Sequence, residues 1–217
     1  FNNTLTVAGT GAIVAVAASE FRLNRNNTPP IAVTIDPGIT LRGRSSITNW
    51  TSSNTLTNRG TIIANVPGAD FQISISTLIN QGALIGTNSG RLLLDSAATT
   101  STGTLTADGG TFATRNATWS HTGTLQLLNS GTLDLGGTFT LAGAIQRSGG
   151  TAQIVGILNG GLNLAGPLGT WNLRDNGTIS GGAIHAPILV VAGHTANFSG
   201  VTLREDGVSR RLEARPE

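Results

Sequence analysis

The chain of 217 residues contains no cysteine, no methionine and no tyrosine, and all 13 of its basic residues are arginine. Without cysteine, disulfides cannot hold the fold, and cysteine usage gives no information on the cellular compartment. Charged residues make up only 11% of the chain and aromatic residues 4%. Hydrophobic residues reach 38% and the net charge is only +2, which argues against a disordered chain.

The distribution of charge and of apolar residues excludes two further classes of partner. The arginines are scattered along the chain except near its C-terminus, whereas a nucleic-acid surface needs a clustered basic face. The apolar run from Ile13 to Ala18 is far too short to span a membrane, and no basic segment precedes it as in a signal peptide. We therefore expect no nucleic acid and no membrane insertion of this segment. Because position 1 is not methionine, we also expect a processed piece of a larger precursor.

What the sequence does contain is short alternation between apolar and polar residues, clearest from Gly123 to Gly143 (GTLQLLNSGTLDLGGTFTLAG). Three pairs of apolar residues each flank one polar residue: Leu125 and Leu127, Leu133 and Leu135, and Phe139 and Leu141. Residues two apart in a strand point to the same face, so each pair predicts one short strand with one buried side. Asn-Ser-Gly and Gly-Gly between the pairs are turn sequences. The stretch predicts three strands and three corners.

The alternation recurs at a nearly constant interval along the chain. The triplet Gly-x-Ile/Leu begins at Gly60, Gly82, Gly103, Gly123 and Gly143, with steps of 22, 21, 20 and 20 residues. A sandwich or an up-and-down barrel also has short strands with regular turns. The very short strands and the interval near twenty favour an all-β solenoid, in which stacked coils bury one continuous core. At about 20 residues a coil, the chain has room for about ten coils.

The ends of the repeat define the domain organisation. We expect the solenoid to span residues 1–203, with a loop excursion at 18–30 where an Asn run and two prolines interrupt the rhythm. Residues 204–217 hold many charges and predict an end cap, linker or tail, since charge at a solenoid end discourages stacking of strand edges.

Residues with catalytic or metal-binding chemistry do not gather in the sequence. The acidic residues before position 204 fall at most about once in each coil, whereas cleavage of a sugar requires several carboxylates on one face. His121, His185 and His194 lack metal-ligand spacing, and we expect His121 to lie in solvent at a corner. Thr-x-Thr pairs that could form an ice-binding ladder, such as those beginning at Thr4, Thr55, Thr104 and Thr138, do not recur once per coil. We therefore predict no catalytic residue, no metal, no cofactor and no ice-binding face.

One set of residues has the chemistry of a binding surface. Arg22 and Arg25 lie in the expected excursion, and Arg42, Arg44 and Trp50 follow closely in the sequence. Arginine beside tryptophan can bind a sugar or form a cation–π pair, although a single tryptophan is also common at a corner or in a core.

The run GTLDLGGTFTLAGAIQRSGGTAQIVGILNGGLNLAG, followed by GTWNLRDNGTISGGAI and FSGVTL, resembles repeats of large secreted bacterial surface proteins. These are the autotransporter-passenger-like and filamentous-haemagglutinin-like β-solenoids, and the resemblance covers residues 55–203. It carries over no functional residue. It implies export to the cell surface and a right-handed parallel β-helix that serves as an adhesin, stalk or extracellular fibre.

The sequence therefore predicts a non-catalytic structural segment: a rigid adhesin stalk or an extracellular fibre subunit. The candidate partners are a second copy of the chain, stacked end to end or laterally, and surface polysaccharide. The alternative is a carbohydrate-binding or carbohydrate-cleaving parallel β-helix, which a carboxylate cluster or a row of aromatic residues in one groove would favour.

Overall fold

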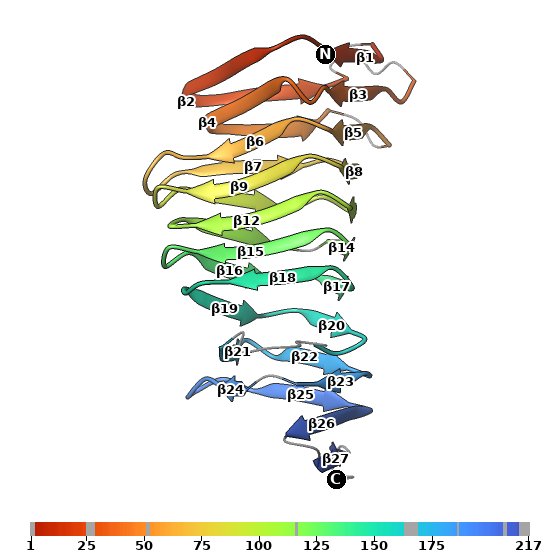
Figure 1. Ribbon diagram of the computed structural model, residues 1–217. Coiled ribbons are helices and arrows are strands. Elements are labelled where there is room, and N and C mark those ends of the chain that lie inside the picture. Colours follow the sequence, from red (N-terminus) through yellow and green to blue (C-terminus); the bar gives the residue numbers. More distant parts are fainter. Residues whose placement is uncertain are drawn as a thin grey trace.

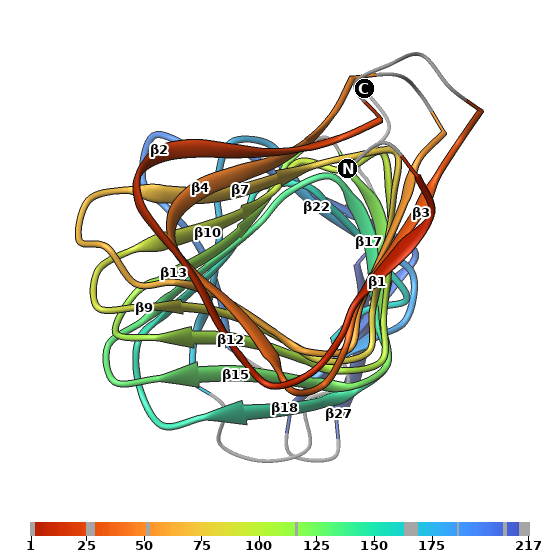
Figure 2. The same ribbon diagram turned by 90° about the horizontal axis from the view of Figure 1, so that it is seen from above.

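The computed structural model describes residues 3–24, 29–50, 53–115, 117–162, 169–185, 187–205 and 208–212. It is a parallel β-solenoid with the two termini at opposite ends of the stack (Figure 1). Seen from the N-terminal end, the chain runs clockwise as it recedes from the viewer, so the winding is right-handed (Figure 2). The predicted fold class is confirmed.

The number of coils is lower than predicted, about 8 turns of about 21 residues rather than ten of about 20. The reason is that the first turns are longer than the predicted twenty residues. The step between stacked residues is 28 from Thr4 to Ala32 and 23 from Ile31 to Asn54, and it falls to 19 near the C-terminus, from Asn176 to Thr195.

The strands form three sheets. The ten-stranded sheet contains, in spatial order, β1 (Leu5–Val7), β3 (Ala32–Ile35), β5 (Thr55–Asn58), β8 (Thr77–Asn80), β11 (Ala98–Ser101), β14 (Thr118–His121), β17 (Thr138–Leu141), β20 (Ile157–Asn159), β22 (Gly177–Ser180) and β25 (Ala196–Ser199). The 14-stranded sheet has two arms that meet at β4 (Ile39–Asn49), which also pairs with β2 (Gly11–Leu23). Its first arm is β6 (Thr61–Ala64), β9 (Ala83–Thr87), β12 (Thr104–Asp108), β15 (Thr124–Leu128) and β18 (Ala144–Arg147). Its second arm is β7 (Asp70–Ser74), β10 (Arg91–Leu94), β13 (Thr111–Thr114), β16 (Thr132–Leu135), β19 (Thr151–Ile154), β21 (Trp171–Leu173) and β24 (Ile188–Val190). A small sheet at the C-terminal end contains β23 (Ala183–Ile184), β26 (Val201–Glu205) and β27 (Val208–Leu212).

A typical turn has three strands, one for each side of the winding. In the stretch from Gly123 to Gly143 these are β15, β16 and β17, as the sequence predicted. Strand pairs throughout the three sheets are parallel apart from β26 and β27, which pair antiparallel at the C-terminal end. At the other end, Ser19 to Leu23 continue β2 and pair with Ser45 to Asn49, and residues 25–28 of the expected excursion lie outside the described residues.

The core consists of columns of inward side chains, each stacked on its counterpart one turn earlier. On the ten-stranded sheet one column runs Leu56, Leu78, Thr99, Trp119 and Phe139, all at most 5% exposed. The rings of Trp119 and Phe139 are stacked, with centroids 4.6 Å apart and an interplanar angle of 8°. Burial of each large apolar side chain contributes roughly 1.5–3 kcal/mol, so the column is a main source of stability.

The glycines of the repeated triplet stack at one corner. A Cβ atom placed on Gly82, Gly103, Gly123 or Gly143 would lie 1.9 to 2.0 Å from the carbonyl oxygen of the triplet glycine one turn earlier. That distance is far shorter than any real contact of a Cβ atom, so only glycine lets successive turns approach at this corner. The repeat seen in the sequence therefore has a steric cause.

A second inward column on the ten-stranded sheet is polar. The side-chain amide of Asn58 donates to Asn80 Oδ1 at 2.8 Å, and that of Asn80 donates to Ser101 Oγ at 3.1 Å. His121 stands next in the column and is 1% exposed, so the prediction that it lies in solvent is wrong. Residue 121 has the inward parity of its strand, which outweighs its nearness to the corner.

Candidate binding surfaces

The structure brings together two of the five residues predicted to form a binding surface. The guanidinium carbon of Arg22 lies 4.6 Å from the centroid of the Trp50 ring, and Trp50 is 54% exposed. Arg22 also forms an ion pair with Glu20, whose carboxylate accepts a hydrogen bond from Thr48. The hydrogen bond from Arg22 is the main cause that lowers the pKa of Glu20. The arginine is thus engaged by both a ring and a carboxylate.

Two of the other three predicted residues lie away from this pair. Arg42 and Arg44 are exposed on β4, and Arg44 precedes Trp50 by six residues, about 20 Å of extended chain. Arg25 lies outside the described residues. Among the described residues, the pair that the structure brings together is Arg22 and Trp50, in which Arg22 covers one face of the ring.

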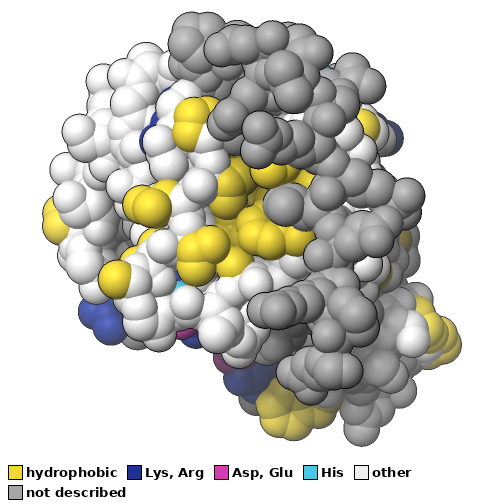
Figure 3. Space-filling model, turned by 90° about the horizontal axis from the view of Figure 1, so that it is seen from below, with side chains coloured by type: hydrophobic (Ala, Val, Ile, Leu, Met, Phe, Trp, Pro, Cys, Tyr) yellow, Lys and Arg dark blue, Asp and Glu magenta, His cyan; other side chains and the backbone are white. Residues whose placement is uncertain are grey.

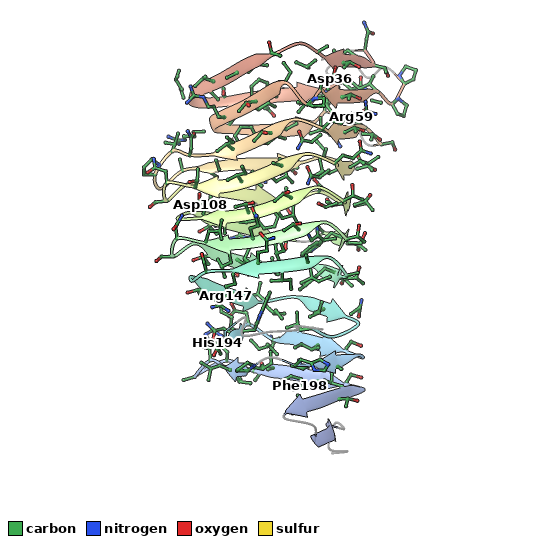
Figure 4. All side chains as sticks on the ribbon, in the orientation of Figure 1. Asp36, Arg59, Asp108, Arg147, His194 and Phe198 are labelled. Atoms are coloured by element: carbon green, nitrogen blue, oxygen red, sulfur yellow. The ribbon has the colours of Figure 1, made fainter. Side chains whose placement is uncertain are left out.

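Charged side chains are distributed along the stack, as the labelled residues from Asp36 to His194 show (Figure 4). Several pair with a neighbour one turn away. Arg91 donates to both carboxylate oxygens of Asp70, at 2.9 and 2.5 Å, and the two residues are partners in register. His194 Nδ1 lies 2.9 Å from Asp175, whose pKa is lowered mainly by the hydrogen bond from Arg174.

No candidate metal site or membrane-spanning helix is found in the part of the chain that the structure describes. Among these residues, no three side chains of the types His, Cys, Asp or Glu are grouped so that they could hold a metal ion. The same residues contain no helix with the length and hydrophobicity to cross a bilayer.

The outer side of the ten-stranded sheet is a surface that the sequence analysis missed. Its strands place two outward residues on each turn, and these stack in register as two ranks. The first rank is Ala32, Thr55, Thr77, Ala98, Thr118, Thr138, Ile157, Thr178 and Asn197. The second rank is Thr6, Thr34, Thr57, Ile79, Thr100, Ser120, Thr140, Asn159, Ser180 and Ser199. We call these two ranks the hydroxyl face.

Ten threonines and three serines occupy the nineteen positions of the hydroxyl face, and none of the nineteen is charged. The strict pairs Thr55/Thr57 and Thr138/Thr140 belong to it, whereas Thr104/Thr106 lie on β12 in another sheet. A search for Thr-x-Thr alone missed the face because intervening turns carry relaxed forms, such as Thr118-x-Ser120. A search for Thr, Ser or Ala at both positions, with a step free to vary, would have found six of its pairs and missed Thr77/Ile79, Ile157/Asn159 and Asn197/Ser199.

A shallow depression of about 300 Å³ lies in the middle of the hydroxyl face. It covers β11, β14, β17 and the end of β20, and its outward lining residues are Ala98, Thr100, Thr118, Ser120, Thr138, Thr140 and Asn159. In the first rank Ala98 stands between Thr77 and Thr118, so its short side chain leaves space there. The depression combines hydroxyl and methyl groups with no charge.

No protein-family model, curated protein or solved structure matches the chain.

Proposed function

We propose that this chain is a non-catalytic, rigid structural segment of a secreted bacterial surface protein, such as an adhesin stalk or an extracellular fibre. The observation that carries the proposal is the ten-stranded sheet, whose parallel register runs from β1 to β25 without a shift. The strands lie about 4.8 Å apart, so this sheet extends about 45 Å along the axis. A continuous ladder over one core can hold two ends at a fixed separation.

Two further features support this role over the carbohydrate-active alternative. The carboxylates are spread over successive turns or paired with cations, and Arg22 covers one face of the exposed Trp50 ring. The resemblance of the repeats to autotransporter-passenger-like and haemagglutinin-like solenoids supports export to the bacterial surface as part of the same proposal.

Rigidity can be tested with spin labels, since the chain has no cysteine of its own. Cysteines substituted for Thr57 and Ser180 would lie six strands apart on the ten-stranded sheet. Cysteines substituted for Thr34 and Ser199 would lie eight strands apart. We expect narrow distance distributions by pulsed electron paramagnetic resonance, with backbone separations near 29 and 38 Å. Broad distributions, or means that do not rise with the number of strands, would refute the rigid spacer.

The ends of the solenoid support end-to-end self-association as part of the proposal. On the first turn Val16 is 91% exposed, and β1 and β2 have no partner on their outer edges among the described strands. Apolar side chains also gather on the C-terminal end (Figure 3), where Leu189 and Val190 of β24 are exposed. Unpaired parallel edges with exposed apolar groups are templates for another chain.

Negative-stain imaging and sedimentation as a function of concentration test this association. As the concentration rises, we expect the parent chain to form rods whose lengths are multiples of the length of one chain. The variant Val16→Asp should remain as rods of one chain, with the circular dichroism of the parent. The matched control is Thr124→Asp, a polar substitution on the side of the solenoid, which should still lengthen. Single rods at every concentration for the parent chain would refute self-association and leave the spacer role standing.

A further inference from the structure

We propose that the hydroxyl face binds ice, the ordered surface of crystalline water. This inference rests on the fold and the register of the ten-stranded sheet, and not on the role proposed above.

The spacing of the hydroxyl face follows from β-sheet geometry. Successive turns repeat about every 4.8 Å along the axis, and two outward residues of one strand lie about 6.6 Å apart. Every strand pair from β1 to β25 keeps its register, so the two ranks form one continuous two-dimensional grid. An ice surface is likewise a periodic grid of oxygen atoms on the same length scale. Liquid water has no such period, so the grid distinguishes the solid from the liquid.

The chemistry of the face fits a neutral, hydrogen-bonding lattice. None of the nineteen outward positions is charged, whereas the 14-stranded sheet carries outward charges such as Arg42, Asp70, Arg91 and Asp134. A charged group holds a strongly oriented hydration shell that an ice lattice cannot accommodate, since it would have to be desolvated or would disrupt the lattice. A threonine offers one hydroxyl to the lattice and one methyl group that restricts where water can sit. The presence of outward charges on the 14-stranded sheet and their absence from the hydroxyl face favour a neutral occupant for the hydroxyl face.

The face is rigid enough for a lattice to be recognised. Threonine is branched at Cβ and has few χ1 rotamers, so little side-chain entropy is lost when it is fixed. Directly beneath the centre of the face, the stacked rings of Trp119 and Phe139 are 3% and 1% exposed and hold β14 and β17 from inside. The hydroxyls are therefore arranged in advance, which reduces the cost of binding.

Other occupants fit the face less well. A nucleic acid needs basic residues, and the face has none. A protein partner needs large apolar or aromatic anchors, and the only large apolar side chains among the nineteen positions are Ile79 and Ile157. A crystalline polysaccharide such as cellulose or chitin is neutral and periodic, but no aromatic ring points outward from these two ranks. Ice is the occupant that needs hydroxyls, methyl groups and a period, and nothing else.

The depression suggests one substitution that should strengthen ice binding by the hydroxyl face and one that should abolish it. Ala98 interrupts the first rank between Thr77 and Thr118, so Ala98→Thr would add the missing hydroxyl and methyl groups. Thr118→Lys would place a charge beside the depression. The matched control is Thr124→Lys, the same change at an outward position on β15 in the other sheet.

The experiment measures ice binding directly on the full chain. Fluorescently labelled protein is offered to a growing ice hemisphere, and thermal hysteresis and inhibition of ice recrystallisation are measured alongside, with circular dichroism as the check of folding. We expect the parent chain and Thr124→Lys to enter the ice and inhibit recrystallisation equally. Thr118→Lys should remain folded and lose both activities, and Ala98→Thr should inhibit at a lower concentration than the parent.

Three results would overturn the proposal. The first is exclusion of the folded parent chain from ice. The second is equal loss in Thr118→Lys and Thr124→Lys, because the hydroxyl face would then have no special role. The third is binding to cellulose or chitin that Thr118→Lys abolishes while ice is ignored, which would assign the face to a neutral polysaccharide. None of these results bears on the distances between spin labels, so the spacer role is tested separately.

Discussion

Gly123 is the position where the stacking of turns can be tested most sharply, through the substitution Gly123→Ala. The new methyl carbon would lie 1.9 Å from the carbonyl oxygen of Gly103 and 2.4 Å from that of Thr102. Both neighbours are backbone atoms, so no side chain can swing away to make room. The two turns must separate by about an ångström at this corner, because real Cβ contacts are at least about 3 Å.

The cost follows from what that separation disturbs. The N–H of Thr124 donates to Gly103 O at 3.1 Å, and the N–H of Ala144 donates to Gly123 O at 3.0 Å. Overpacking costs about 1–3 kcal/mol, and each weakened hydrogen bond adds about 1 kcal/mol. We expect a loss of about 3 kcal/mol, which lowers the melting temperature by roughly 6–12 °C for a chain of this size.

The assay is thermal unfolding followed by circular dichroism, together with hydrogen exchange of the amides at this corner. The control is Thr124→Ala, the adjacent residue, whose side chain is half-buried and points outward and whose loss should cost no more than about 0.5 kcal/mol. Exchange should rise at Thr124 and Ala144 in Gly123→Ala alone. If Gly123→Ala melts with its control, close stacking is not the reason for the glycine repeat.

Three further predictions concern the interior. Leu127→Asp places a carboxylate at a position that is 1% exposed and should cost several kcal/mol in urea unfolding, and a parent-like midpoint would mean that Leu127 does not face inward. Asn80→Ala removes a partner of both Asn58 and Ser101 and should cost about 1–3 kcal/mol, which a neutral result would contradict. Burial lowers the pKa of His121, so the imidazole binds a proton more readily in the unfolded chain than in the folded one. The free energy of unfolding should therefore fall as the pH drops below about 6.5, the ordinary pKa of histidine. The fall should be at most about 1.4 kcal/mol per pH unit and should end once the pH is below the folded-state pKa. His121→Leu should flatten this dependence in melts from pH 7.5 to 5, and an unchanged slope would rule out His121 as its source.

The environment of His121 gives this pH dependence its physical basis. The imidazole makes no hydrogen bond of standard geometry, and only weak backbone contacts to Thr124 and Ser101 oppose the effect of burial on its pKa. Its neighbours in the column are Ser101 before and Leu141 after, neither of which carries a charge. A leucine at position 121 would match Leu141, which occupies the same place in the column one turn later.

The coil from Gly123 to Gly143 was predictable because two local rules agree there. Alternation with a period of two identifies the inward side chains, and glycine marks the corner where turns approach most closely. These rules need no knowledge of distant residues. The same alternation assigned Leu125, Leu133 and Phe139 to the core, where each is at most 1% exposed.

His121 and the hydroxyl face were not predictable in the same way, because both depend on register between turns. The corner after His121 suggested solvent, but the strand continues through residue 121 with inward parity. The threonines of the hydroxyl face align only when the step between turns shrinks from 28 to 19 residues along the chain. A fixed interval loses this alignment after a few turns, and only the three-dimensional pairing restores it.

The neutrality of the hydroxyl face is not a general consequence of stacking. In a parallel ladder every side chain stands about 4.8 Å from its counterpart, so like charges repel and polar or opposite partners are favoured. On the 14-stranded sheet, charged residues satisfy this constraint because they have partners one turn away. Arg91 donates a hydrogen bond to Asp70, and Asn129, just after β15, donates one to Asp108. Paired charges are therefore compatible with this architecture, and the nineteen positions of the hydroxyl face carry none. The ice-binding proposal accounts for this neutrality, and Thr118→Lys tests whether the face requires it.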